Sequence, residues 1–171
     1  QISDIHVGNR FDYNYLIDSF KKAQKLNPDF VVYTGDFIDY ESEEQFTQLR
    51  TVLKHVVTGK YGTVGVLGNH DYGKNWSEEN VAQNVISVLK EHNIDVLRNS
   101  KTSYQGLNFI GVDDYWSTNF YPKEATKNFD VNQPYVALCH NPDVCDLDVW
   151  NGYNPITNTT TIKTCAIRQA I

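Results

Sequence analysis

The 171-residue sequence contains no methionine, no low-complexity segment and no apolar run of the roughly 18 residues that a membrane span needs. Its three cysteines are odd in number and none are spaced Cys-x-x-Cys, so we expect ordinary thiols, not a disulfide framework or a thiolate zinc site. Neither Gly-x-Gly-x-x-Gly nor a P-loop occurs, which removes the usual backbone cradles for nucleotide phosphates. If the protein binds a phosphate, side chains or bound ions must therefore hold it in place of a glycine-rich loop.

Charge and length narrow the possibilities further. The sequence has 21 acidic and 15 basic side chains, giving a net charge of -6 that repels nucleic-acid polymers. An anionic substrate would need local positive charge, which bound metal ions can supply. We expect one domain over residues 1–171, truncated at its start because residues 1–3 resemble a strand end. Its expected location is cytoplasmic or membrane-peripheral, with an upstream targeting segment left open.

The hydrophobic pattern predicts an α/β fold. Apolar residues at helical spacing indicate helices near residues 16–26 and 43–57, and a third that starts after Ser77 as its N-cap and stops near residue 93. Between them, residues 30–33 and 61–67 are apolar runs typical of strands covered on both faces. After residue 93, short strands joined by turns indicate a second, more antiparallel sheet. The expected strands lie near residues 94–97, 102–105, 107–112 and 135–139. Helical segments are expected at residues 120–130 and 146–150.

Four polar clusters follow predicted strands, at residues 4–6, 35–39, 68–71 and 139–142. Asp4 and Asp36 are 32 residues apart, and Asp36 and Asn69 are 33 apart, which is one βαβ unit each time. Ligand sites of open α/β sheets lie at the carboxyl ends of the strands. We therefore expect the four clusters to meet at one edge of the fold.

These side chains are suited to hold two divalent cations. Asp4 and His6 are two residues apart, point the same way and can grip one ion. The Asp36 carboxylate can bridge to a second ion, for which Asn69 offers a carbonyl oxygen and His140 an imidazole. Two ions ~4 Å apart would lower the pKa of a shared water and clamp a phosphoryl group. Asp4 and Asp36 bring two negative charges and the two ions bring four positive ones. The site would therefore keep a net positive charge that attracts hydroxide and phosphate.

His70 is the candidate general acid of such a site. It follows Asn69 directly, so a backbone that aims Asn69 at a metal leaves His70 beside the substrate. We expect Asp71 to orient the His70 imidazole and to raise its pKa, as a carboxylate does for a histidine that donates a proton.

The series Asp4-x-His6, Gly35-Asp36-x-x-Asp39, Gly68-Asn69-His70-Asp71 and His140 resembles the calcineurin-like metallophosphoesterase superfamily. Further segments at 68–73, 96–99, 111–114 and 140–143 resemble its bacterial branch of small phosphohydrolases, of which some act on phospholipid-derived or nucleotide-sugar lipids. The resemblance implies a four-layer α/β sandwich of two mixed β-sheets flanked by helices. It implies two divalent ions (Mn, Fe, Zn or Mg) on the five ligands named above, with His70 as acid and Asp39 as support for the ligands. The implied partner is a small phosphorylated substrate, such as a lipid or a nucleotide-sugar lipid.

The sequence departs from the family pattern near its end. The family expects a Gly-His-x-His motif that completes both metals, but residues 154–166 contain no histidine. We therefore expect the domain to be abnormal or truncated after about residue 153. The main hypothesis is a metal-dependent phosphohydrolase that cleaves a phosphomonoester, phosphodiester or pyrophosphate bond by metal-activated water. The alternatives are a catalytically impaired domain that binds a metal or a phospholigand, and an unrelated doubly wound domain.

Several residues near the predicted site have two interpretations. Tyr72, Trp76, Tyr115 and Trp116 either line a substrate groove or pack locally, since aromatic side chains near loops do both. Asp113 and Asp114 follow a predicted strand and could face the site, but we expect them to form a turn.

Overall fold

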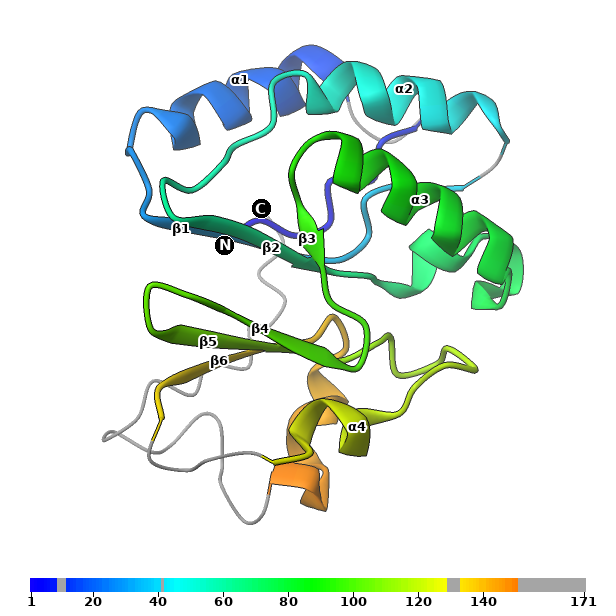
Figure 1. The fold of residues 1–171 in the computed structure, drawn as a ribbon. Coiled ribbons are helices and arrows are strands. Elements are labelled where there is room, and N and C mark those ends of the chain that lie inside the picture. Colours follow the sequence, from blue (N-terminus) through cyan, green and yellow to red (C-terminus); the bar gives the residue numbers. More distant parts are fainter. Residues whose placement is uncertain (9–11, 41, 129–132, 151–171) are drawn as a thin grey trace.

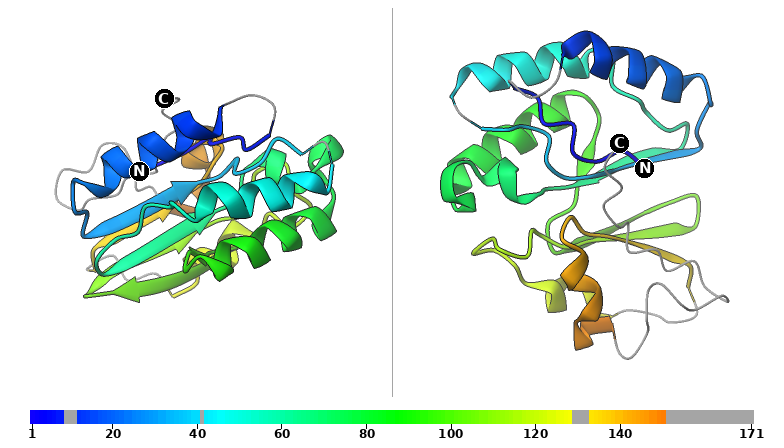
Figure 2. Two further views of the ribbon diagram at one scale, coloured as in Figure 1. Left: turned by 90° about the horizontal axis from the view of Figure 1, so that it is seen from above. Right: turned by 180° about the vertical axis from the view of Figure 1, so that it is seen from behind.

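The computed structural model describes residues 1–8, 12–40, 42–128 and 133–150. The elements form four layers (Figure 1). Three helices, α1 (Tyr13–Gln24), α2 (Glu44–Leu53) and α3 (Glu79–Glu91), cover the outer side of one sheet, and a second sheet packs on its other side (Figure 2). Beyond the second sheet lie α4 (Pro122–Thr126) and the short 3-10 helices η3 (Pro142–Asp146) and η4 (Asp148–Trp150). The predicted four-layer α/β sandwich is confirmed.

The first sheet is parallel, with β1 (Phe30–Thr34), β2 (Gly62–Val66) and β3 (Asp95–Val96) in that order. Helices α2 and α3 make the crossovers, as parallel neighbours require. The amino-terminal segment lies beside β1, where Ile2 pairs with Tyr33 and Val7 with Ile38. The polar cluster at residues 4–6 therefore lies next to the polar cluster at residues 35–39, which follows β1.

One strand lies in a different sheet from the one expected. We predicted that residues 94–97 belong to the second sheet, but β3 pairs parallel to β2, through Val64 with Asp95 and Gly65 with Val96. The chain returns from α3 beside β2, and the Leu97 N–H then donates to the Gly65 carbonyl at 2.8 Å. Residues 94–97 look like the first of several short strands joined by turns, but the crossover through α3 places this strand beside β2 in the first sheet.

The second sheet is mixed, as expected, whereas the first is parallel in its described strands. Strand β4 (Ser100–Tyr104) pairs antiparallel with β5 (Leu107–Gly111), and β5 pairs parallel with β6 (Tyr135–Leu138). Between the sheets Val64 and Val66 of the first pack on Phe109 and Leu138 of the second. This shared core fixes the two sheets against each other.

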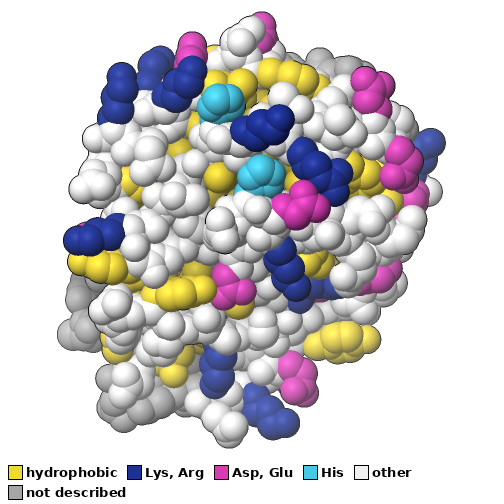
Figure 3. Space-filling view, turned by 45° about the horizontal axis from the view of Figure 1, so that its top comes forward, with side chains coloured by type: hydrophobic (Ala, Val, Ile, Leu, Met, Phe, Trp, Pro, Cys, Tyr) yellow, Lys and Arg dark blue, Asp and Glu magenta, His cyan; other side chains and the backbone are white. Residues whose placement is uncertain are grey.

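The helices are amphipathic and have polar outer faces. Helix α1 buries Leu16 and Phe20, and the side chain of its N-cap, Asp12, accepts a hydrogen bond from the Asn14 N–H. Helix α2 ends before residue 57, and the N-cap of α3 is Glu78, not Ser77. The face above these helices mixes charges of both signs with separate apolar patches (Figure 3). None of the helices described is both long and apolar enough to cross a membrane.

The cysteines differ from one another. Cys139 is a buried free thiol at the end of β6, whereas Cys145 is disulfide-bonded. The prediction of ordinary thiols is therefore wrong for Cys145, because the spacing of cysteines along a chain does not determine which of them meet in space.

Candidate active site

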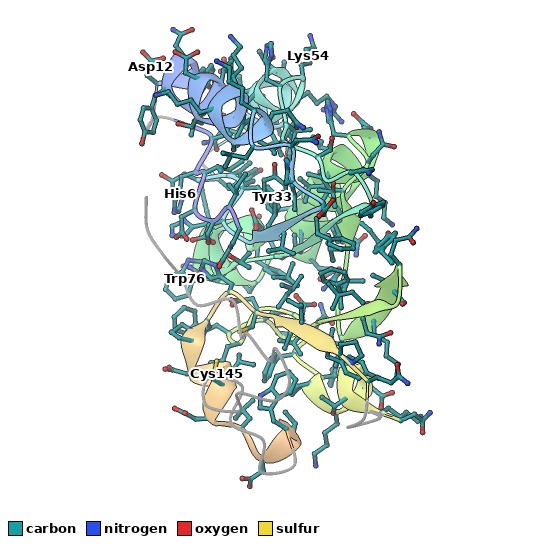
Figure 4. All side chains as sticks on the ribbon, turned by 90° about the vertical axis from the view of Figure 1, so that its left-hand side faces the viewer. His6, Asp12, Tyr33, Lys54, Trp76 and Cys145 are labelled. Atoms are coloured by element: carbon teal, nitrogen blue, oxygen red, sulfur yellow. The ribbon has the colours of Figure 1, made fainter. Side chains whose placement is uncertain are left out.

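The strands deliver four of the expected ligands to one edge of the two sheets. Asp36 follows β1, Asn69 follows β2, and His6 lies in the segment beside β1, on the edge of the molecule seen in Figure 4. His140 follows β6 of the second sheet. Its Nδ1 lies 2.8 Å from the Thr34 carbonyl oxygen, which selects Nδ1 as the protonated nitrogen and turns Nε2 toward the other ligands.

Asp36 lies at the centre of the cluster. Its Oδ2 is 3.4 Å from His6 Nε2 and 3.3 Å from His140 Nε2, so one carboxylate oxygen lies between two imidazoles. Asp4 Oδ1 is 3.7 Å from His6 Nε2. The potential ligand atoms of Asp4, His6 and Asp36 all lie within 4.8 Å of one another. Carboxylate and imidazole donors this close fit a divalent cation, with Asp36 able to bridge to a second one.

The backbone of this cluster adopts an uncommon conformation. Asp4, His6 and Asp36 have φ values of 56°, 41° and 57°, in the left-handed region that non-glycine residues rarely occupy. Each such residue costs on the order of 1–3 kcal/mol and persists where the surroundings impose it, often at functional sites. A side chain on Gly68 would collide with the Asp36 carboxylate. Three of the predicted metal ligands therefore share a conformation that aims their side chains inward.

Asp71 has a different role from the predicted one. Its carboxylate is fully buried and accepts hydrogen bonds from the N–H groups of Asp36, Phe37, Ile38 and Gly68, at 3.0, 2.8, 3.2 and 2.9 Å. The loops after β1 and β2 are thereby tied to one side chain. The 3-10 turn η1 (Asn69–Tyr72) directs Asp71 beneath these loops, so it cannot orient His70.

The partner of His70 is Asp39. The two are joined by His70 Nδ1 and Asp39 Oδ1 at 3.0 Å, and the His70 ring lies edge-on to His6 with centroids 4.9 Å apart. With Nδ1 engaged by the carboxylate, Nε2 is the ring nitrogen left for contact with a substrate. The His70 side chain is 26% exposed, against 7% for His6, so a substrate can reach it. His6, Asp39 and His70 form a second group with ligand atoms close together, although Asp39 acts here as the orienting carboxylate.

The electrostatic potential of the site favours a cation. Burial alone would lower the pKa of His140, but the hydrogen bond and negative charge of Asp36 outweigh it and raise the pKa to about 9. Burial and the Asp36 charge raise the pKa of Asp71 to about 7. Burial likewise raises the pKa of Asp114 to about 6. Burial is the main cause for both carboxyl groups, and the negative charge of Asp36 contributes to all three shifts. A bound cation would offset that charge.

A second polar network, which was not predicted, includes Tyr72 of η1, the turn that also carries Asn69 and His70. The Arg98 guanidinium contacts Glu79 at 2.6 and 3.0 Å, Asp113 at 2.7 Å and the Tyr72 hydroxyl at 2.9 Å. Asp113 and Tyr72 also hydrogen-bond directly and are both buried. Arg98 lies between β3 and β4, and its guanidinium is largely buried, so it must find partners of this kind.

The predicted turn role is therefore wrong for Asp113. It is confirmed for Asp114, whose Oδ1 accepts the Trp116 N–H and whose carbonyl accepts the Ser117 N–H, both at 3.0 Å. Tyr72 packs locally instead of lining a groove.

The chain belongs to a known class of protein. Residues 1–163 match the calcineurin-like phosphoesterase family, so the chain belongs to that family, whose members use divalent metal ions. The segment 154–166, where we noted the missing Gly-His-x-His motif, lies mostly within this match but outside the described residues.

Several curated proteins are similar to this chain. The UDP-2,3-diacylglucosamine pyrophosphatase LpxG of Chlamydia muridarum is 27% identical, over 84% of this chain and 56% of the relative. The uncharacterized protein YpbG of Bacillus subtilis is 31% identical, over 84% and 52% respectively. An uncharacterized metallophosphoesterase of Helicobacter pylori is 27% identical over 82% of the chain and 37% of the relative. The chain thus spans about half or less of the length of these relatives.

Proposed function

We propose that this domain is a phosphohydrolase that uses two divalent ions to cleave a phosphomonoester, phosphodiester or pyrophosphate bond. The observation that carries the proposal is the position of the Asp36 carboxylate oxygen between the imidazoles of His6 and His140. Bound divalent ions, whether Mn, Fe, Zn or Mg, would supply positive charge to the phosphoryl oxygens and acidify the attacking water. Membership of the calcineurin-like phosphoesterase family supports the same reaction.

Each side chain has a proposed task. Asp4 and His6 would hold one ion, Asn69 and His140 the other, and Asp36 both. His140 Nδ1 is held by the Thr34 carbonyl, so Nε2 is the nitrogen that would release its proton and bind a metal ion. This set has two carboxylates for four positive charges, which leaves net positive charge for an anionic substrate.

The proposed task of His70 is to protonate the leaving group. Its Nδ1 is paired with Asp39, which orients the ring and leaves Nε2 for the substrate. In this scheme His70 gives its Nε2 proton to the oxygen that leaves phosphorus. Asp71 contributes only by fixing the loop that carries His70.

The proposed substrate is a small phosphorylated molecule, and a lipid or a nucleotide-sugar lipid is the class to test first. Its support is the name of the LpxG relatives from Chlamydia, which are UDP-2,3-diacylglucosamine pyrophosphatases. Because identity to them is 27%, the proposal concerns the substrate class and not the particular molecule.

The test of the proposed activity is hydrolysis of bis-p-nitrophenyl phosphate with added Mn²⁺. This chain is compared with a variant that carries a Gly-His-x-His segment after residue 153. We expect hydrolysis that EDTA abolishes, faster in the variant because more ligands hold the ions. No hydrolysis by the variant would reject the proposal.

A second candidate is a domain that binds a metal or a phospholigand without catalysis. The observation that favours it is the absence of histidine from residues 154–166. Elemental analysis of the purified chain separates the two, since two tightly bound ions per chain would rule out the non-catalytic candidate.

Replacing His70 by glutamine is expected to slow hydrolysis most where the leaving oxygen is basic. For phenyl or alkyl esters we expect a loss of roughly 10²–10⁴ in rate, the usual contribution of a general acid. A 2,4-dinitrophenyl ester needs no proton and should lose far less. The measurement is a series of leaving groups of increasing pKa, with His55→Gln, an exposed histidine beyond α2, as the matched control. An equal loss across the series would contradict the assignment.

A further inference from the structure

Two tryptophans that the proposed reaction does not use stand together at the surface. The rings of Trp76 and Trp116 stack with centroids 5.1 Å apart and planes inclined by 23°. They are 40% and 51% exposed. Trp76 belongs to η2 (Lys74–Trp76), after β2 of the first sheet, and Trp116 to the loop after β5 of the second. This tryptophan pair therefore connects the loops of the two sheets without being buried by either.

The tryptophan pair borders the candidate active site. The Trp76 ring centroid is 6.3 Å from that of His70, the proposed acid. Trp116 lines a pocket together with Asn69 and His140, two of the proposed metal ligands. Figure 4 shows Trp76 on the same edge of the molecule as His6. A group attached to a phosphate in the site on the His70 side would meet these indoles.

The backbone at Trp76 is strained although the indole lies outside the hydrophobic core. Asn75 and Trp76 have φ values of 57° and 56°, and a bulky side chain in this region is an outlier. Strain of this kind persists where the surroundings impose it, and burial of the indole could explain it in a core. Trp76 is 40% exposed and is part of none of the hydrophobic core clusters of the described residues, so core burial does not account for the strain. An outlier of this kind beside an active site motivates a functional hypothesis.

We propose that the tryptophan pair is a binding platform for a planar aromatic group on the leaving-group side of the substrate. The inference rests on the proposed function, because the phosphate must lie at the Asp36 cluster. Stacked indoles present a flat π surface, which favours a planar ring such as a nucleobase over a flexible chain. The short separation of Trp76 from His70 requires the ring to be linked closely to the phosphate, as it is in a nucleoside monophosphate.

Calorimetric titration in the presence of Mn²⁺ tests this platform. The probes are AMP, ribose 5-phosphate, which lacks the base, and hexyl phosphate, which is apolar but not planar. Released phosphate is measured in parallel to correct for turnover. We expect AMP to bind roughly 5- to 150-fold more tightly than ribose 5-phosphate, the range for stacking one base on an aromatic side chain.

Substitutions assign the preference to the indoles. Trp116→Ala should reduce the AMP preference to about twofold or less, and Trp116→Phe should retain part of it. Tyr121→Ala, at an exposed aromatic residue near α4, is the matched control and should change nothing. Trp76→Phe, which keeps an aromatic ring at the strained position, serves as the second variant if Trp116→Ala unfolds.

The outcomes are distinct. Equal binding of AMP and ribose 5-phosphate would overturn the platform, and so would a greater gain from hexyl phosphate, which would indicate a site for an apolar chain. An AMP preference that survives Trp116→Ala would also overturn it. Because binding is measured apart from turnover, a chain that prefers AMP but never hydrolyses an ester counts against the proposed function alone.

Discussion

Replacing Asp36 by asparagine is expected to lower Mn²⁺-dependent phosphoester hydrolysis at least about 1,000-fold, or about 4 kcal/mol of transition-state stabilisation. The change removes one negative charge from the oxygen that lies between the His6 and His140 imidazoles. An amide oxygen is a weaker ligand and cannot bridge two cations as a carboxylate does. We expect Mn²⁺ affinity to fall with the activity, and both are measured, by hydrolysis and by calorimetric titration of the metal.

The shape of the side chain is preserved, so the fold should survive this change. Asp36 Oδ1 accepts a hydrogen bond from the backbone N–H of His70 at 3.0 Å, and an asparagine side-chain oxygen can accept the same bond. Asp18→Asn, which removes an exposed carboxylate on α1, controls for the loss of one charge. Mn²⁺ affinity that stays the same in Asp36→Asn would contradict the assignment of Asp36 as the shared ligand.

Replacing Asp71 by alanine is expected to destabilise the folded chain by roughly 3–5 kcal/mol. The carboxylate is fully buried and serves four backbone N–H groups, which would lose their acceptor together. A buried donor without a partner costs about 1–3 kcal/mol, and the four terms do not add fully because the loops relax. The loss is a large share of the 5–15 kcal/mol that stabilises a typical domain.

Urea unfolding followed by circular dichroism measures this free energy. Asp18→Asn on the surface of α1 should change it by no more than about 0.5 kcal/mol. Asp71→Asn keeps an oxygen but turns an amide N–H₂ toward backbone donors, so it should fall between the wild type and Asp71→Ala. A stability equal to that of the wild type in Asp71→Ala would mean that water replaces the carboxylate.

The sequence predicted the strand ends of the site better than the contacts made there. Apolar runs located β1 and β2 to within one or two residues, and their spacing identified parallel crossovers. The same logic placed Asp36 and Asn69 at one edge, since parallel strands of one sheet end together. This part of the fold is set by local pattern.

The partners of side chains depend on turns that the pattern does not describe. Asp39 and Asp71 are both near neighbours of predicted ligands, yet Asp39 contacts His70 and Asp71 contacts backbone N–H groups. A single 3-10 turn after β2 decides which carboxylate faces the imidazole. The stack of Trp76 on Trp116 likewise joins residues 40 positions apart, on loops of different sheets. Such contacts follow from the packing of the two sheets, which no local window contains.

The hydrogen bond between His140 and the Thr34 carbonyl has a consequence for the order of folding. It joins residues separated by 106 positions, and each lies at the end of a strand in a different sheet. Closing so long a segment is entropically costly, so contacts of this kind form late, after the locally connected βαβ units. The complete ligand set then exists only after the sheets have docked. A metal ion that binds it would stabilise the native state more than the folding transition state, and would slow unfolding without hastening folding.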